Sequence, residues 1–470
     1  MSEPALSDAI AAHVAAMRWE DLPEAARAAA AAVLLDAVGV TAAASGLARE
    51  VRPFVDLAVA NGPGPCSILG TPARVQPLAA ALANGAMAHA VDYEDAFDRA
   101  PAHPNASLVP ALLALAQAKA PVDGRQLLTA LAVGGDLSCR IALALRRPME
   151  VGGWYPPPIV AAYGAAAGAA NLLGLPAPQV RDALSLVLCQ VTIPGEIKHS
   201  RTTVLRAVRE AFPAQAAVQS VLLARGGVAG LERPLEGEAG FFALYAGGEF
   251  DPHDLTDRLG RHFWGPELTF KPWPSCRGTH AFIEMVLDWR ARHGIDPAAI
   301  ARIEVEVDEV QAMLVEPLAR KQAPATAIDA KFSIPFTLAL ALVRGGVTLD
   351  DFAPAALGDA SLLAMSGKVA PRVIDKPGWQ RGAGGALRLV LADGTEHRAR
   401  LDDALGCPAR PLSHAMRRAK FRDCLSRAAT PLDAAEADAL ADRIEAIAHN
   451  TDAGSVFHFG GAPSARGDCA

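Results

Sequence analysis

Acidic and imidazole side chains interrupt an otherwise apolar, alanine-rich stretch of the chain at residues 81–110. Asp92, Glu94 and Asp95 follow a predicted apolar helix, and His103 closes the loop behind them. A carboxylate at the end of one helix and an imidazole at the start of the next would face a common cleft, an arrangement suited to proton transfer. In the alternative interpretation, the acidic residues are the polar end of a helix and His103 is a loop histidine.

The loop that contains His103 is predicted to lead into a second helix. Asn105 or Ser107 would be its N-cap, because their side-chain oxygens can accept hydrogen bonds from the amides of the first turn. The sequence leaves the direction of the His103 pKa shift open. The helix N-terminus disfavours an imidazolium, whereas a nearby carboxylate of Asp92 or Asp95 favours it.

A second polar group lies at residues 192–209, which contain Lys198, Arg201, Arg206 and Arg209. In an acidic protein, such a cluster is either a solvated helix face or a site for an anion. Guanidinium groups suit an anion such as a carboxylate, which they bind with two parallel hydrogen bonds.

A third group is the loop at residues 271–280, which is rich in turn-forming residues and hydrogen-bond donors. Lys271 and Arg277 are its cations. Cys276 is interpreted as a packing residue rather than a nucleophile, because buried cysteines are commonly inert. His280 either caps the helix predicted to begin at residue 281 or contacts a substrate.

Composition limits the possible partners of the chain. Its 470 residues carry a net charge of −7 with a pI near 6.0, which predicts neither a nucleic-acid partner nor an anionic membrane partner. The seven cysteines show no C-x-x-C spacing, so we expect no zinc or iron–sulfur motif and reduced thiols in the cytoplasm. The N-terminal residues MSEPALSDAI lack the pattern of a signal peptide, and the small-residue segment 159–173 predicts a core helix rather than a membrane span.

Hydrophobic periodicity predicts two kinds of structure along the chain. Helical spacing dominates the first 268 residues and returns in a helix at 433–448. Alternating apolar residues predict a strand at 301–310, and Asp393-Gly394 between two alternating runs predicts a hairpin at 387–401. Strands interleaved with helices indicate an α+β domain from about residue 270 to about residue 425.

Several motifs, taken in order, are similar to those of one family. They are Asn84-Gly85, His89, Asp92-Tyr-Glu-Asp95, His103-Pro104, GAAAGAA at 164–170, LEGEAGFF at 235–242, KPWPSCRGTH at 271–280 and AKFSIPF at 330–336. The chain thereby resembles the MmgE/PrpD family, which includes 2-methylcitrate dehydratases, cis-aconitate decarboxylases and iminodisuccinate epimerases. The resemblance implies an α+β protein with a helical domain at 1–268, completed by a C-terminal helix at 430–460, and a smaller α+β lid at 269–429. It also implies a homodimer, an inter-domain cleft, and chemistry without a metal or an organic cofactor.

The resemblance also assigns roles to residues of this chain. Asp92 and His103 match the acid/base pair, Lys271 matches the basic residue at the lid, and Lys331 and Ser333 match the AKFS-type segment. The implied catalytic residues are Asp92, His103, Lys198 and Tyr155, and the implied substrate-binding residues are Arg201, Arg209, Lys271, Cys276, Arg277, His280, Lys331 and Ser333.

Three positions depart from the family pattern. Ala96 stands where members often have Thr, and Tyr155 stands where many have His. Tyr155 either donates a hydrogen bond there or packs. The active-site lysine position aligns with Arg209, while Lys198 lies earlier in the chain; an arginine cannot act as a base at neutral pH.

The expected function is a cofactor-independent lyase of the hydratase/dehydratase type that acts on a small di- or tricarboxylate. Loss of water from such an acid needs a base for the C–H proton and an acid for the leaving hydroxyl, while cations stabilise the developing charge. An epimerase or isomerase, a decarboxylase of a related polycarboxylate, and a catalytically silent carboxylate-binding protein are the alternatives.

Overall fold

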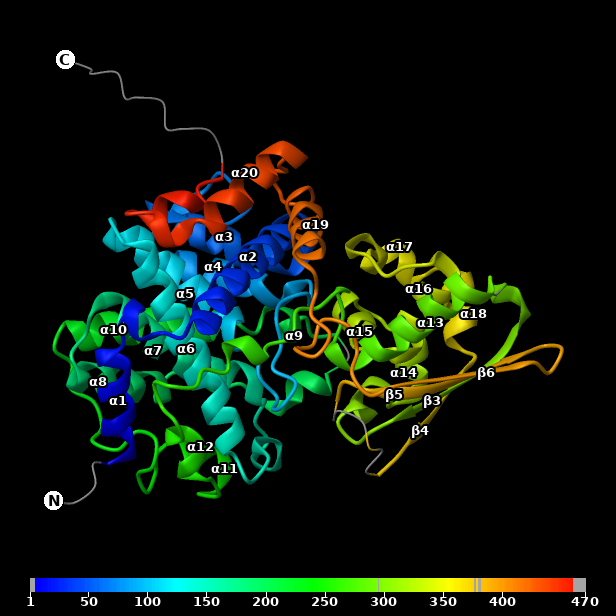
Figure 1. Cartoon of the computed structure of the whole chain (residues 1–470), viewed down its shortest axis with the longest axis horizontal. Coiled ribbons are helices and arrows are strands. Elements are labelled where there is room, and N and C mark those ends of the chain that lie inside the picture. The colour runs from blue at the N-terminus through cyan, green and yellow to red at the C-terminus, as the bar shows by residue number, and fades with distance from the viewer. Residues whose placement is uncertain (1–4, 201, 295, 376–377, 379–381, 460–470) are drawn as a thin grey trace, which may run out of the picture.

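The computed structural model describes residues 5–459, apart from residues 201, 295, 376–377 and 379–381. A large part of the chain forms a bundle of helices, and a smaller part carries a four-stranded sheet with helices packed beside it (Figure 1). This confirms the predicted α+β class, with a large helical domain and a smaller α+β domain. The boundaries 1–268 and 269–429 stay a prediction.

The helical part contains α1 (Leu6–Ala16), α2 (Glu24–Leu47), α3 (Arg52–Ala60), β1 (Pro63–Ser67), β2 (Arg74–Val75), α4 (Pro77–Ala90), α5 (Pro104–Lys119), α6 (Gly124–Ala144), α7 (Pro156–Leu173), α8 (Ala177–Leu188), α9 (Leu205–Val208), α10 (Ala211–Arg225), α11 (Phe241–Ala246) and α12 (Pro252–Thr256). The smaller part contains α13 (His280–His293), β3 (Ile300–Val307), α14 (Leu318–Gln322), α15 (Ala327–Lys331), α16 (Ile334–Arg344), α17 (Pro354–Leu357), α18 (Ala360–Ser366), β4 (Val369–Val373), β5 (Gly385–Leu391) and β6 (Glu396–Leu401). The chain ends with α19 (His414–Leu425) and α20 (Ala434–Glu445).

Small residues let the core helices approach one another closely. A Cβ atom on Gly164 of α7 would lie 2.3 Å from the carbonyl oxygen of Gly134 in α6. On α4, a Cβ atom on Gly85 would lie 2.6 Å from the carbonyl oxygen of Glu210. Real Cβ contacts are longer than this, so glycine is required at both positions. The second contact presses α4 against the segment that carries Arg209.

The sheet of the smaller part has the strand order β4-β3-β5-β6. β3 pairs with β4 in parallel and with β5 in antiparallel register, and β5 and β6 form the predicted hairpin. In β3, Ile303, Val305 and Val307 are buried while the intervening glutamates are not, so the predicted alternation is confirmed.

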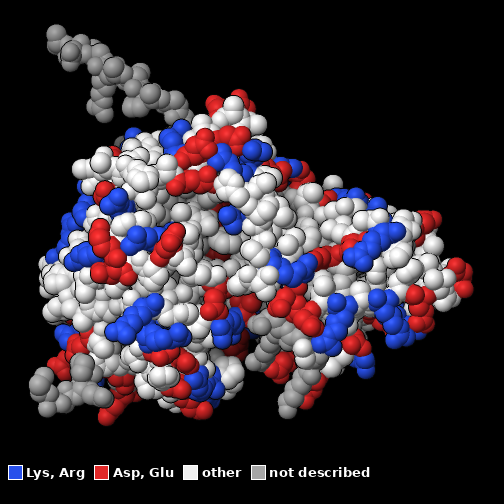
Figure 2. All heavy atoms as spheres, viewed as in Figure 1, with Lys and Arg blue, Asp and Glu red and all other residues white. Residues whose placement is uncertain are grey.

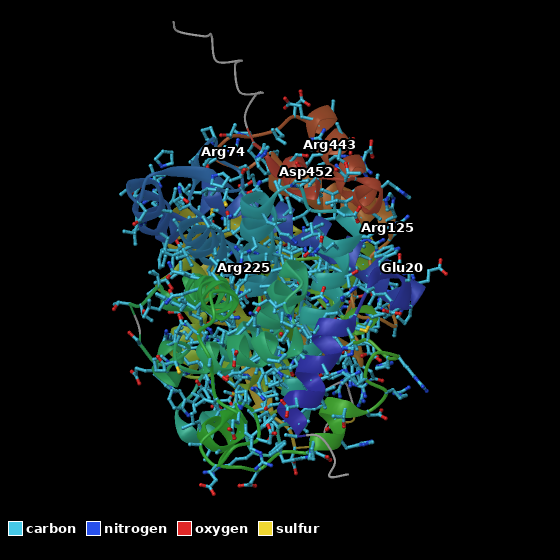
Figure 3. All side chains as sticks on the ribbon, turned by 90° about the vertical axis from the view of Figure 1, so that its left-hand side faces the viewer. Glu20, Arg74, Arg125, Arg225, Arg443 and Asp452 are labelled. Atoms are coloured by element: carbon cyan, nitrogen blue, oxygen red, sulfur yellow. The ribbon has the colours of Figure 1, made fainter. Side chains whose placement is uncertain are left out.

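The C-terminal helices return to the helical part after the chain leaves the sheet (Figure 1). α19 packs against α2, and α20 packs against α19. Viewed from the side, Arg443 and Asp452 of this C-terminal segment lie at the same end of the molecule as Arg74 of β2 (Figure 3). The predicted C-terminal helix at 433–448 is therefore observed as α20, followed by short turns.

Two described helices, α2 and α6, are long and apolar enough to cross a membrane. Both are mostly buried among the other helices, as core helices of a folded domain are. On the face drawn in Figure 2, acidic and basic side chains are interspersed. A cytoplasmic location stays a prediction.

Two details of the predicted secondary structure are wrong. The predicted N-caps Asn105 and Ser107 lie inside α5, whose N-cap position is occupied by His103. Pro104 starts α5 earlier in the chain than predicted. Its fixed φ suits the first turn of a helix, and it has no amide hydrogen that would be left unpaired there. Among the described residues of 192–209, the helical elements are a short 3-10 turn at Gly195–Lys198 and the four-residue α9, so these residues form no continuous polar helix face.

Candidate active site

The loop between α4 and α5 begins with Asp92 in an unusual backbone conformation. Its φ is +51°, a backbone conformation that residues other than glycine rarely adopt. Such a conformation costs free energy and persists only where the surroundings hold it. The Nζ of Lys271 provides one such hold, because it donates to the Asp92 carbonyl oxygen at 3.2 Å and to Asp92 Oδ1 at 2.5 Å.

Lys271 forms an ion-pair cluster with the two carboxylates of this loop. Its Nζ lies 3.6 Å from Glu94 Oε2, and its side chain is fully buried beside side chains of Asp92 and Glu94 that are 1% and 2% exposed. Burial alone would lower the pKa of the Lys271 ammonium, but Asp92 and Glu94 outweigh burial and hold this pKa above its usual range. Lys271 therefore stays a cation and a proton donor although it is buried.

His89 links the carboxylates to a buried arginine. The Nη1 of Arg209 lies 2.5 Å from His89 Nε2, and a guanidinium can only donate, so this nitrogen accepts. The proton of the neutral imidazole is therefore on Nδ1, which donates to Glu94 Oε1. Burial and the neighbouring Arg209 lower the pKa of His89 well below its usual value. His89 is thus a neutral bridge between Arg209 and Glu94.

His103 has one ring nitrogen held by the acidic loop. Its Nδ1 lies 2.9 Å from the carbonyl oxygen of Asp95 and 3.1 Å from Glu94 Oε1. A carbonyl oxygen can only accept, so Nδ1 carries the proton and Nε2 keeps its lone pair. Burial lowers the pKa of His103 well below its usual value, although Glu94 opposes this shift. At neutral pH, His103 is an uncharged base.

Two expectations for this loop are corrected by these contacts. The side-chain carboxylate beside His103 is that of Glu94, whereas Asp95 contacts the ring only through its backbone. The Asn105 side chain donates to Asp95 Oδ2 at 2.8 Å instead of capping the helix. Burial raises the pKa of Asp95 to about 7 despite this hydrogen bond.

The basic group at residues 192–209 divides into buried and exposed members. The Nη1 of Arg209 donates to the Tyr155 hydroxyl at 3.3 Å, and Arg206 stacks 3.4 Å from the centroid of the Phe332 ring. Lys198 is 22% exposed, lies 5.6 Å from the Tyr155 ring centroid and pairs with Glu150 at 3.6 Å. Lys198 therefore lies at the edge of the site, beside the Tyr155 ring. Arg201 lies outside the described residues.

Two residues of the AKFS segment lie close to the cluster. The Phe332 ring contacts His89 edge-on, with the ring centroids 6.3 Å apart. Lys331 is buried, with its Nζ 3.4 Å from the Pro274 carbonyl oxygen and 3.7 Å from the Phe352 ring centroid. Burial lowers the pKa of Lys331 to about 7, so this amine is only partly charged at neutral pH.

Four other predicted substrate-binding residues make contacts of a different kind. Ser333 caps α16 by accepting from the Phe336 amide at 3.0 Å and donates to the Lys321 carbonyl oxygen at 2.6 Å. Arg277 pairs with Asp98 at 2.9 Å and donates to the carbonyl oxygens of residues 404 and 405. These partners give Ser333 and Arg277 structural contacts, and their predicted substrate contacts stay a prediction.

His280 and Cys276 also belong to the support of the loop at residues 271–280. His280 is the first residue of α13, and its Nε2 donates to the Ser275 carbonyl oxygen at 3.1 Å. Burial lowers the pKa of His280 well below its usual value. Burial also raises the pKa of the Cys276 thiol, which disfavours the reactive thiolate. This agrees with the interpretation of Cys276 as a packing residue.

Sequence reasoning missed several members of the cluster. Glu94 was only one of several acidic residues, although it contacts His89, His103 and Lys271. Glu210 pairs with Arg209 at 3.0 Å and accepts from the Ser107 hydroxyl at 2.5 Å. His89 and Glu94 lie five residues apart, so their closeness in the sequence could have indicated their contact. The Ser107 partner of Glu210 lies 103 residues away, and no local pattern predicts that contact.

The ligand-type atoms of His89, Asp92 and Glu94 lie within 4.8 Å of one another, as the ligands of a metal ion do. Two buried cations already neutralise this group: Lys271 contacts both carboxylates, and Arg209 contacts the outer nitrogen of His89. A divalent ion here would be repelled by both side chains. The donor set therefore suits internal ion pairing better than metal binding.

Together, a helical domain, a smaller α+β domain and a buried acid–base–cation cluster define a two-domain protein equipped for proton transfer. Comparison with known families is consistent with this class. Residues 8–253 match the MmgE/PrpD N-terminal domain, and residues 273–446 match the MmgE/PrpD C-terminal domain. The chain belongs to the MmgE/PrpD family.

Curated relatives of the chain are named as decarboxylases. A cis-aconitate decarboxylase-like protein of Aspergillus oryzae is 29% identical over 342 residues, which cover 68% of this chain and 70% of that protein. The cis-aconitate decarboxylase of Mus musculus is 26% identical over 364 residues, covering 74% of this chain and 72% of that protein. That of Homo sapiens is 27% identical over 291 residues, covering 59% of this chain and 58% of that protein.

Proposed function

We propose that this protein is a cofactor-independent lyase that removes water or carbon dioxide from a small di- or tricarboxylate. The observation that carries the proposal is His103, a neutral imidazole with a side chain only 17% exposed, whose Nε2 is unprotonated and whose Nδ1 is fixed by the acidic loop. Because its pKa is held low, the ring is uncharged at neutral pH, so Nε2 can accept a proton from a substrate carbon held within hydrogen-bond reach.

The charges around the cluster favour an anionic substrate. Lys271 and Arg209 each have carboxylate partners, but Arg206 is buried and forms an ion pair with no described residue. A buried, unpaired cation is costly unless an anion joins it. A substrate carboxylate would supply that anion, and a second carboxylate would be drawn toward Lys271 and Arg209.

For dehydration, His103 Nε2 takes the proton from the carbon next to a carboxylate. The electron pair of that C–H bond forms an enolate-like anion, which Lys271 and an arginine stabilise. This pair then forms the C=C bond as the C–O bond to the neighbouring carbon breaks. The departing hydroxide takes a proton from the Lys271 ammonium, which Asp92 orients, and leaves as water.

Decarboxylation is the second candidate, and the names of the relatives favour it. Here the bond between carbon and the leaving carboxylate breaks, and carbon dioxide departs. The electron pair left on the substrate carbon then takes a proton from an acid of the same cluster, such as the Lys271 ammonium. Both reactions use the same residues to move a proton and to stabilise a carbanion-like charge.

A substrate panel tests the proposal. Hydroxy-polycarboxylates would be followed at 240 nm for new conjugated double bonds, and unsaturated tricarboxylates, including cis-aconitate, would be followed for release of carbon dioxide. We expect turnover in one of the two assays. Folded protein that turns over no acid in either assay contradicts the lyase.

A third assay separates the remaining alternatives. Exchange of a substrate α-hydrogen with deuterated water, without loss of water or carbon dioxide, would identify an epimerase. A thermal shift with a carboxylate, without any turnover or exchange, would identify a binding protein, because a ligand that binds only the folded state raises its melting temperature.

A further inference from the structure

Lys420 of α19 contacts the backbone beside two of the candidate catalytic residues from outside the site. Its side chain is 5% exposed, and its Nζ donates to the carbonyl oxygen of Tyr93 at 2.7 Å and to that of Lys271 at 3.1 Å. The same Nζ pairs with Asp36 Oδ1 of α2 at 2.6 Å. An ammonium has three donors, and these three contacts use all of them.

The two carbonyl groups belong to the segments that form the acid–base cluster. Tyr93 directly follows Asp92, whose backbone has the strained φ of +51°. Lys271 is the cation that holds the Asp92 side chain and carbonyl group. Lys420 is therefore a single point that links α19, α2, the acidic loop and the Lys271 backbone. In Figure 1, α19 lies where the chain returns from the sheet-bearing part to the helical part.

Lys420 makes no contact with the ring nitrogens of His89 or His103 or with the Asp92 carboxylate in the described residues. It cannot exchange a proton with a substrate held by that cluster without moving. Its contacts instead fix the peptide groups on either side of the Asp92–Lys271 ion pair.

We propose that Lys420 is a positioning residue that holds the acidic loop and the Lys271 backbone in register, so that the strained Asp92 faces the Lys271 ammonium. Its catalytic part rests on the proposed function, whereas its structural part does not. Asp36 makes the arrangement possible, because a buried ammonium needs a compensating carboxylate.

Removing Lys420 alone would leave the Asp36 carboxylate buried without its partner, which destabilises any protein. The informative variant is therefore the double change Asp36→Asn and Lys420→Met. It removes both charges and keeps a side chain of similar length, but the Tyr93 and Lys271 carbonyl groups still lose their donor. Arg422→Met is the matched control, because Arg422 lies on the same helix and pairs with the half-exposed Asp438.

The test compares the crystal structure, melting temperature and kinetics of these proteins. In the double variant we expect Asp92 to leave the positive-φ region or to lose its hydrogen bond to Lys271. We expect kcat to fall about 10- to 100-fold with KM changed less than about threefold, because small misplacements of catalytic groups are costly. We expect Arg422→Met to change neither the Asp92 geometry nor kcat.

A double variant that keeps the Asp92 φ and the Lys271–Asp92 contact overturns the proposal. A double variant whose kcat and melting temperature both match those of the wild type also overturns it. Should it fail to fold, Asp36→Asn with Lys420→Gln, which retains one amide donor, is judged by the same criteria. If the wild-type protein turns over no acid, the proposed function fails, while the crystal structure still decides the role of Lys420.

Discussion

His103 and Glu94 define the chemistry of the site at the scale of single residues. The Asp95 carbonyl oxygen fixes the proton of His103 on Nδ1, and burial keeps the ring neutral. Glu94 acts in the opposite direction, since its carboxylate attracts a proton to His103. The balance between burial and Glu94 therefore sets the pH at which His103 becomes a base.

We predict that Glu94→Gln shifts the acidic limb of the pH profile of kcat/KM to lower pH. The amide removes the negative charge that raises the His103 pKa, so this pKa falls further, and His103 stays neutral in more acidic solution. The acidic limb reports the pKa of the base in the free enzyme. The pH dependence of kcat/KM would be measured for the wild type and the variant on the same substrate.

Glu267→Gln is the control for this prediction, because Glu267 pairs with the exposed Arg99. Its acidic limb should coincide with that of the wild type. A limb that stays in place in Glu94→Gln, or moves to higher pH, would show that Glu94 does not tune His103.

At the scale of elements, α16 shows how a motif residue can serve the fold. Ser333 stands at the N-cap of α16, with its hydroxyl bonded to the Phe336 amide and to the Lys321 carbonyl oxygen. The neighbouring Phe332 instead contacts His89 and Arg206. The segment therefore brings an aromatic ring to the site and uses its serine to start the following helix.

We predict that Ser333→Ala lowers the free energy of unfolding by about 1–2 kcal/mol, the cost of a lost N-cap. KM for the substrate should change less than about twofold, because the hydroxyl is committed to the helix. Denaturant unfolding and steady-state kinetics measure the two effects. Asp123→Ala, which removes the exposed N-cap of α6, is the control for loss of a cap alone. A stable Ser333→Ala protein with a strongly raised KM would restore the predicted substrate contact.

The sequence predicts elements and local motifs better than it predicts the partners of individual side chains. The hairpin at β5 and β6, the strand β3 and the terminal helix α20 follow from periodicity and turn residues that lie within a few positions of each other. The resemblance assigns Asp92 and Lys271 to the site, but their direct contact is found only in the structure. The AKFS motif, however, does not predict whether the Ser333 hydroxyl contacts a substrate or caps the following helix.

Lys420 illustrates a contact that local patterns cannot reveal. Its two carbonyl acceptors lie 327 and 149 residues away in the sequence. Within α19 it is one of several basic residues, of which Arg418 and Arg422 pair with the partly exposed Asp438 of α20. Only the packing of α19 on α2 distinguishes it from them.

At the scale of the whole molecule, most of the site is buried, while the His103 side chain is 17% exposed. Asp92 and Lys271 are buried, and Phe332 of the smaller part packs against His89. We predict that a substrate reaches the buried members of the cluster when these segments separate, and that their return excludes water from the reaction.

We also predict that two copies of the chain associate. Phe212 of α10 is 44% exposed and lies 6.1 Å, between ring centroids, from Phe54 of α3, and Leu57 one turn further is 54% exposed. Exposed apolar groups of this kind are typical of interfaces. Light scattering should give about twice the chain mass of 48.8 kDa, and Phe212→Asp should shift the mass toward one chain. A mass near 48.8 kDa for the wild type at all concentrations would refute the dimer.

The central claim is that His103 moves a proton of a small carboxylic acid. Its most direct test is hydrogen exchange in deuterated water, followed by NMR on the acid that the wild-type enzyme turns over. His103→Asn keeps a donor and an acceptor but loses the titrating nitrogen. We expect the wild type to exchange or release the α-hydrogen, and His103→Asn to lose about 10²–10⁴-fold in both this rate and kcat, with little change in KM. Near-wild-type exchange by a folded His103→Asn protein would contradict the account.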